Sequence, residues 1–94
     1  MLIRTVRIST KAKRALGSVR GYVVDKLETW VDAVERDGLQ EVRKIHGYHD
    51  EPLKGKRQGQ RSIRLSRAYR AIYVVQNEGR AELVSIEEVS KHEY

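Results

Sequence analysis

The segment from residue 69 to residue 75 constrains the fold most, because no other part of the chain is as strand-like. It is rich in aromatic and β-branched residues, which favour strands. Residues 60–65 alternate in character and precede it closely, so the two segments are predicted to pair as a hairpin. Asn77 and Gly79 supply a second turn, since both tolerate a positive φ, and residues 80–89 follow as a further strand. The C-terminal part of the chain is therefore predicted to be an antiparallel meander.

A strand and two helices are predicted before this meander. Residues 2–8 alternate like a strand, and Ser9 with Thr10 can cap a short helix predicted over residues 11–19. The second helix has a stripe of apolar side chains at a period of 3.6 residues, with its acidic side chains largely on the opposite side. It is predicted to end at Gly38, a residue suited to the left-handed position after a last helical turn. The apolar stripe consists of Val23, Leu27, Trp30, Val31 and Val34.

This order of elements predicts an α+β fold. Two N-terminal helices are expected to pack on one face of a small antiparallel sheet, in the order β-α-α-β-β-β. The other face of the sheet stays open, and basic side chains of the meander can project from it. A chain of 94 residues has room for one modest core, so residues 1–94 are predicted to form a single domain.

Charge is distributed in blocks along the chain, whose formal net charge is +6. Residues 1–20 carry six basic groups and residues 53–70 carry seven, and neither block contains an acid. Residues 21–52 hold eight acids against four bases. Two basic blocks on a small domain are typical of a surface that binds a polyanion, most often nucleic acid. The alternative is that these lysines and arginines are simply solvated on two exposed faces.

Several classes of function are disfavoured by what the sequence lacks. It contains no Cys, which excludes thiolate chemistry and fits a reducing compartment, so the cytoplasm is the predicted location. The longest apolar run, residues 71–75, is too short for a membrane span or a signal peptide, and no membrane partner is expected. His46 and His49 lack further ligands at metal-binding spacing, and no glycine-rich phosphate loop is present. Neither a metal nor a cofactor is therefore predicted.

The remaining residue types suit RNA cleavage without a metal. In that reaction a base removes the proton of a ribose 2′-hydroxyl, the oxygen attacks the adjacent phosphorus, and an acid protonates the leaving 5′-oxygen. Cations stabilise the negative charge that builds on the phosphate. Glu51 and His49 are candidate bases beside the lysines and arginines of the second basic block. His92 and Tyr94, at the end of the sequence, are candidate acids.

Residues 51–73, EPLKGKRQGQRSIRLSRAYRAIY, resemble the central motif of the RelE/HigB/YoeB superfamily of bacterial toxins. In that group an E/H-P-L-K-G segment is followed by a G-x-x-S-x-R strand and an x-R-x-x-Y strand. The final KHEY at 91–94 resembles the short C-termini of the same group. The resemblance implies a RelE-like fold and ribosome-dependent cleavage of messenger RNA, which arrests translation. It also implies inhibition by a cognate antitoxin, in a complex that can bind its own operator DNA.

The resemblance also implies roles for individual residues. Glu51 matches the general base of YoeB-like members, Arg70 their phosphate-contacting arginine, and Arg64 another basic strand residue. Tyr94 matches the terminal tyrosine, but its usual histidine neighbour is displaced, because one residue separates it from His92. These five residues form the predicted catalytic set. The predicted RNA-binding residues are Lys11, Lys13, Lys54, Lys56, Arg57, Arg61 and Arg67.

Two rival functions remain open at this point. A ParE-like toxin of similar fold would poison DNA gyrase and would need no ribonuclease residues. A simple RNA-binding module would use the basic face without catalysis. Single residues also have structural alternatives: Glu51 would then only cap a turn or pair with Lys54. Trp30, Tyr69 and Tyr73 would pack in the core or at its rim rather than stack on RNA bases.

Overall fold

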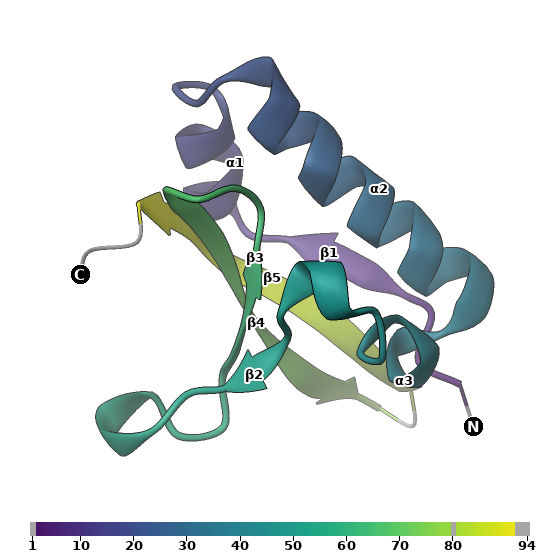
Figure 1. Cartoon of the computed structure of the whole chain (residues 1–94). Helices are drawn as coiled ribbons and strands as arrows, with labels where there is room; N and C mark the ends of the chain where they lie inside the picture. The colour runs from purple at the N-terminus through teal and green to yellow at the C-terminus, as the bar shows by residue number, and fades with distance from the viewer. Residues whose placement is uncertain (1, 80, 92–94) are drawn as a thin grey trace.

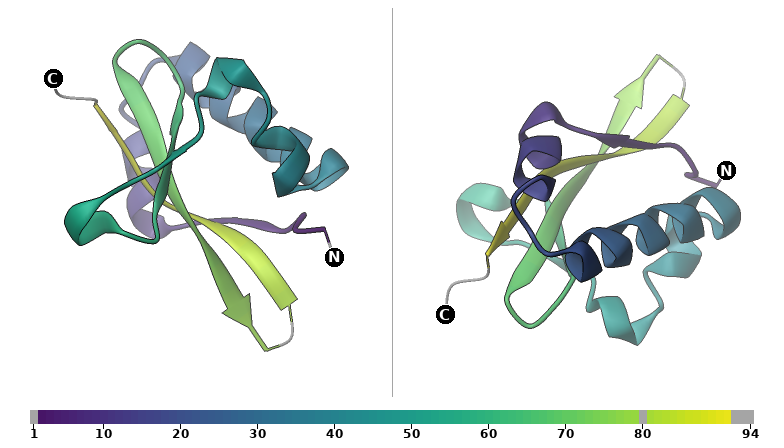
Figure 2. Two further views of the ribbon diagram at one scale, coloured as in Figure 1. Left: turned by 60° about the horizontal axis from the view of Figure 1, so that its bottom comes forward. Right: turned by 90° about the horizontal axis from the view of Figure 1, so that it is seen from above.

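The protein, described by a computed structural model over residues 2–79 and 81–91, is built around one five-stranded sheet (Figure 1). Its elements are β1 (Val6–Ile8), α1 (Thr10–Leu16), α2 (Gly21–Asp37), α3 (Leu39–Val42), the 3-10 helix η1 (His46–Tyr48), β2 (Glu51–Pro52), the 3-10 helix η2 (Gly55–Arg57), β3 (Arg61–Arg64), β4 (Tyr69–Glu78) and β5 (Ala81–Lys91). The strand order in the sheet is β1-β5-β4-β3-β2. Helices α1 and α2 lie on one side of the sheet, and η2 lies on the other (Figure 2).

The predicted α+β fold class is confirmed, with two differences in detail. The two-residue strand β2 adds to the predicted order of elements, whereas the short helix α3 falls within residues 39–45, where the sequence allows one further helical turn. The sheet is not wholly antiparallel, because β1 pairs in parallel with β5 while the other neighbours pair antiparallel. β1 and β5 can pair in parallel because a long stretch of chain connects them, whereas a tight turn would force antiparallel pairing.

The N-terminal elements are shorter than predicted. Before β1 the chain leaves the sheet: the carbonyl of Ile3 accepts a hydrogen bond from the amide of Leu39 at 2.9 Å, and the Ile3 side chain is buried. Ser9 caps α1, since its Oγ accepts a hydrogen bond from the amide of Ala12 at 3.0 Å. That helix ends at Leu16, just before Gly17 and three residues earlier than predicted. The first strand begins only at Val6, because Ile3 hydrogen-bonds with Leu39 of α3 and not with a neighbouring strand.

Helix α2 covers the sheet with the predicted apolar stripe, except that Val31 is only half-buried and Ala33 is buried as well. Trp30 packs against Tyr73 of β4 with ring centroids 5.2 Å apart, and both side chains are fully buried, which confirms their core role. The helix ends at Gly38, whose φ of 89° lies in the left-handed region, as predicted. Within the two described ranges, no helix combines the length and the apolar character needed to cross a membrane. The buried residues of α2 are Val23, Leu27, Trp30, Ala33 and Val34.

An irregularity in the pairing of β4 with β5 determines which β5 side chains point into the core and which point to the opposite face of the sheet. Ile72 pairs with Glu88, but Tyr73 pairs with Ile86, so one residue of β5 is left over. Such a bulge reverses the alternation of side chains beyond it. It places Val89 in the core and Glu88 on the face of the sheet opposite α2, which we call the open face.

The turn between β4 and β5 comes later than predicted. β4 continues to Glu78, which pairs with Ala81, so Asn77 belongs to the strand and not to the turn. Gly79 follows with a φ of 65°, a conformation that glycine adopts without strain. The meander itself is confirmed, with longer second and third strands than the side-chain pattern indicates.

Candidate active site

Cross-strand pairing brings one acid and two arginines to the open face of the sheet. Glu51 of β2 pairs with Ser62 of β3, and Arg64 of β3 pairs with Arg70 of β4. Residues directly opposite each other in a sheet project from the same face, and so do residues two apart in one strand. Glu51, Arg64 and Arg70 therefore share the open face, as the sequence predicts for the basic side chains.

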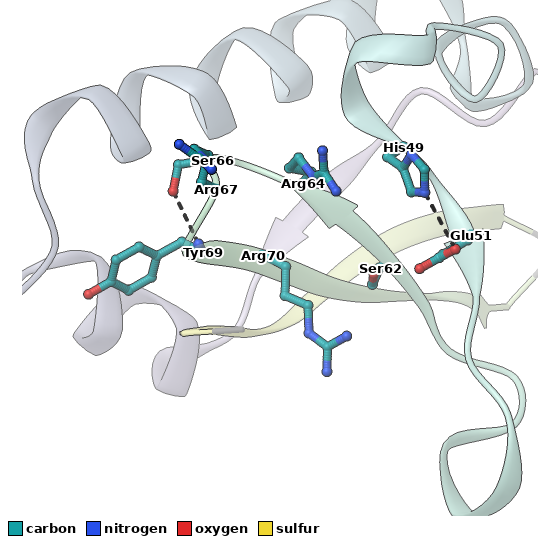
Figure 3. Close-up of a pocket in the computed structure, with 8 residues that line it drawn as sticks. All are labelled: His49, Glu51, Ser62, Arg64, Ser66, Arg67, Tyr69 and Arg70. Atoms are coloured by element: carbon teal, nitrogen blue, oxygen red, sulfur yellow. Dashed lines mark hydrogen bonds and ion pairs between the residues drawn. The ribbon is translucent and has the colours of Figure 1, made fainter. Parts of the chain in front are cut away.

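A pocket of about 80 Å³ lies over these side chains (Figure 3). Side chains of β3 and β4 occupy its middle, the segment that leads into β2 forms one end, and the β3–β4 connection forms the other. Three arginines and one carboxylate line it, so the pocket is positively charged and suits an anion. The residues that line it are His49, Glu51, Ser62, Arg64, Ser66, Arg67, Tyr69 and Arg70.

His49 and Glu51 stand together at one end of the pocket. His49 Nε2 lies 3.8 Å from Glu51 Oε2, and the two side chains are 60% and 55% exposed. The backbone of His49 has a φ of 49°, a left-handed conformation that ends η1 and turns the chain into β2. Either side chain can accept a proton from a bound hydroxyl group, Glu51 as a carboxylate and His49 as a neutral imidazole.

Arg70 and Arg64 form the cationic centre of the pocket. The Nε atom of Arg70 is buried and has no hydrogen-bond partner among the described residues. A buried donor without an acceptor is costly, and like charges on directly opposite residues of a sheet destabilise it. An anion bound in the pocket would offset the repulsion between the two arginines.

Asp50 anchors the segment that carries both candidate bases. Its side chain is fully buried, and it accepts hydrogen bonds from Arg61 Nε and from the hydroxyl of Tyr73, each at 2.6 Å. Tyr73 in turn accepts a hydrogen bond from Arg43 Nε at 3.3 Å. Because Asp50 lies between His49 and Glu51 in the chain, this network fixes the position of both relative to the sheet.

The same network changes the chemistry of Tyr73. Burial of the ring and the hydrogen bond to Asp50 raise its pKa from the ordinary value of 10.0 to about 12, while the hydrogen bond from Arg43 acts in the opposite direction. Burial also opposes the charged form of Arg61, but its hydrogen bond to Asp50 raises the Arg61 pKa overall. The tyrosine hydroxyl therefore stays a donor to Asp50 at any physiological pH.

The predicted RNA-binding residues divide into four groups. Arg67 lines the pocket, whereas Arg61 points to the other side of the sheet and is held by Asp50. Arg57 and Lys11 approach Glu88 on the open face. The remaining lysines are exposed, outside the pocket: Lys13 in α1, and Lys54 and Lys56 beside and within η2.

The structure thus brings together Glu51, Arg64 and Arg70 from the predicted catalytic set. His92 and Tyr94, the other two members, lie outside the described residues. The catalytic role of all five stays a prediction.

Sequence reasoning does not single out Asp50 or Glu88. Both carboxylates make their contacts with residues distant along the chain: Asp50 with Arg61 and Tyr73, and Glu88 with Arg57. No local pattern marks such pairs. The side that Glu88 faces also depends on the β5 bulge, which the alternation of residue types does not reveal.

The fold is similar to that of several solved toxins. A YoeB/ParE toxin from Agrobacterium tumefaciens is 17% identical with a TM-score of 0.70, over 95% of this chain and 99% of that chain. YafQ from E. coli is 19% identical with a TM-score of 0.70, over 95% of this chain and 93% of that chain. A chain of the toxin–antitoxin complex RelBE2 from Mycobacterium tuberculosis is 22% identical with a TM-score of 0.67, over 97% of this chain and 100% of the matched chain.

Sequence comparison alone does not find these relatives. No protein-family model matches the chain, and no curated protein sequence does. At identities of 17–22% the similarity is one of fold, and it confirms the RelE-like fold that the motif at residues 51–73 implies.

Proposed function

We propose that the chain is the toxin of a toxin–antitoxin pair and an endoribonuclease that cleaves messenger RNA on the ribosome without a metal. The observation that carries the proposal is the pocket in which Glu51 stands with Arg64 and Arg70. A base beside clustered cations is the set of groups that 2′-hydroxyl attack on a phosphate requires. The similarity of fold to three solved toxins and the motif at residues 51–73 support the same function.

In the proposed reaction the scissile phosphate sits between Arg64 and Arg70. Glu51 accepts the proton of the neighbouring 2′-hydroxyl, and the resulting oxygen attacks the phosphorus to give a 2′,3′-cyclic phosphate. The two guanidinium groups stabilise the additional negative charge on the phosphate oxygens. The bond to the 5′-oxygen breaks, and that oxygen takes a proton from a general acid.

The general acid in this scheme comes from the C-terminal residues. Tyr94 matches the terminal tyrosine of YoeB-like toxins, and His92 is the alternative. A histidine at its ordinary pKa exchanges protons near neutral pH, whereas a tyrosine must be activated by neighbouring cations. His49 is the alternative general base, because its Nε2 atom lies 3.8 Å from Glu51 Oε2.

The proposed partners are the ribosome with its messenger RNA, and a cognate antitoxin. The M. tuberculosis chain of the same fold was solved in a toxin–antitoxin complex. An acidic or amphipathic antitoxin segment can cover the basic open face and restrain Arg70 or the C-terminal residues. Such a complex is also the species proposed to bind operator DNA. The cytoplasm is the compartment in which all these partners meet.

The proposal is tested by inducing the chain in bacteria while protein and DNA synthesis are pulse-labelled separately. We expect protein synthesis to fall within minutes and DNA synthesis to follow late. An Arg70→Ala chain expressed at the same level is the control and should leave translation running. An early loss of DNA synthesis with gyrase-linked breaks would contradict the proposal and favour the gyrase-poisoning alternative.

A further inference from the structure

A second group of cations surrounds Glu88 on the open face, beside the pocket. Arg57 Nη1 lies 2.9 Å from Glu88 Oε2, and Lys11 Nζ lies 3.7 Å from Glu88 Oε1. Arg57 belongs to η2 and Lys11 to α1, two elements far apart in the sequence. The Glu88 side chain is only 18% exposed, whereas those of Lys11 and Arg57 are 74% and 46% exposed. One enclosed carboxylate therefore holds two cations that otherwise face solvent.

Arg70 connects this group to the pocket. Arg70 pairs with Ser90 and Ile72 pairs with Glu88, so Arg70 and Glu88 are diagonal neighbours on adjacent strands. Diagonal neighbours lie about 7–8 Å apart, within reach of long side chains. The row of paired residues that contains Glu51 and Ser62 continues through Ile72 to Glu88. The two sites are thus continuous along one face of the sheet.

The Glu88 carboxylate is an anion in a positively charged setting. Burial alone would raise its pKa, but the hydrogen bond and charge of Arg57, with the charges of Lys11 and Arg70, lower the pKa overall. One negative charge thus faces three positive ones, and the group as a whole remains cationic. Carboxylate and phosphate oxygens make the same charge-assisted hydrogen bonds to guanidinium and ammonium groups. An external phosphate can therefore take the place of this carboxylate.

We propose that Arg57 and Lys11, bordered by Arg70, form a second phosphate subsite for RNA, which the chain's own Glu88 carboxylate occupies when no RNA is bound. The subsite takes a phosphate that flanks the cleaved bond, because the scissile phosphate belongs between Arg64 and Arg70. This inference rests on the proposed function only in taking RNA as the ligand. Since the Glu88 carboxylate competes with the RNA phosphate for Arg57 and Lys11, it weakens the binding of single-stranded RNA to the open face.

The test measures binding of a short 2′-O-methyl RNA to the Glu88→Gln chain over a range of salt concentrations. This probe has no attacking hydroxyl and cannot be cleaved. Without the Glu88 charge, Arg57 and Lys11 can neutralise one further phosphate of the RNA. Each neutralised phosphate of a single strand makes the slope of log affinity against log salt concentration more negative by about 0.7. At ~0.1 M salt this corresponds to about fivefold tighter binding. Glu82→Gln removes the same charge from an exposed site near the far end of β5, and it is the matched control.

Further variants separate a subsite from a change of net charge. Arg57→Ala added to Glu88→Gln should abolish the gain in affinity. Unchanged or weaker binding by Glu88→Gln, or an equal gain with Glu82→Gln, would overturn the proposal. If Glu88→Gln does not fold, Arg57→Ala and Lys11→Ala in the wild-type chain decide: both should weaken binding and flatten the salt slope, and unchanged binding would overturn the proposal. A chain that passes these tests but cuts no ribosomal mRNA contradicts the proposed function and leaves the subsite standing.

Discussion

Burial of the Tyr73 hydroxyl and its hydrogen bond to Asp50 make the stability of the protein depend on pH in the alkaline range. The folded chain holds the Tyr73 pKa at about 12, against 10.0 as its ordinary value. A pKa that is raised on folding favours the protonated hydroxyl, so the stabilisation is complete below pH 10 and is lost as the pH rises through 12. A tenfold change in an acid dissociation constant corresponds to about 1.4 kcal/mol, so complete ionisation of Tyr73 lowers the free energy of unfolding by about 3 kcal/mol.

Tyr73→Phe removes the ionisable hydroxyl and with it this pH dependence. At pH 7 the variant leaves the buried Asp50 carboxylate with Arg61 as its hydrogen-bond donor, and we expect a loss of about 1–3 kcal/mol in the free energy of unfolding. Between pH 8 and pH 11 the wild-type chain should then lose about 1.4 kcal/mol more than the variant does. Groups that titrate in both chains cancel in this difference.

Urea denaturation at pH 7, 8, 9, 10 and 11 measures both quantities. Tyr22→Phe is the matched control, because the Tyr22 side chain is 59% exposed and its removal should leave the pH dependence as it is in the wild-type chain. If the stabilities of the wild-type and Tyr73→Phe chains fall in parallel from pH 8 to pH 11, the hydroxyl does not carry the assigned pKa. The anchor described for His49 and Glu51 would then lose its support.

Three further predictions concern single residues. Gly38→Ala should lower the free energy of unfolding by more than about 1 kcal/mol in urea denaturation, because φ is 89° and a Cβ would lie 3.3 Å from Leu2 Cδ2. Ser9→Ala should cost about 1 kcal/mol in the same assay, since Ser9 Oγ caps α1 and donates to the Glu87 carbonyl at 2.9 Å; a Ser9→Thr chain should retain most of it. Lys13→Ala should weaken association with ribosomes in a salt-dependent way and leave the rate of the cutting step nearly unchanged, which binding and single-turnover assays distinguish.

The local pattern of the sequence predicts the elements whose causes are local. The apolar stripe of α2 and its end at Gly38 follow from helical periodicity and from one backbone conformation. The β3–β4 hairpin follows from a short connection, and it places Arg64 opposite Arg70. These features need no knowledge of distant segments.

The features that escape prediction depend on contacts between distant segments. β2 is only two residues long, ends in Pro52 and pairs with β3. This pairing brings Glu51 close to the arginines, and the local sequence does not predict it. The parallel pairing of β1 with β5 has the same origin. Asp50 carries no local signal because its partners stand 11 and 23 positions away. Glu88 carries none because the bulge in β5 sets the side that it faces.

Single-turnover cleavage of messenger RNA on programmed ribosomes, at saturating protein, tests most directly whether the open-face pocket is an active site. Glu51→Gln keeps the size of the side chain but is a far weaker proton acceptor, so cleavage should slow while ribosome association stays nearly intact. Arg70→Ala removes a cation that faces the transition state, and the rate should fall about a hundred- to a thousandfold. If Glu51→Gln alone cleaves at the wild-type rate, the general base is His49 or His92 and not Glu51. Wild-type rates for both variants would contradict the account, because the chemistry would then lie outside this pocket.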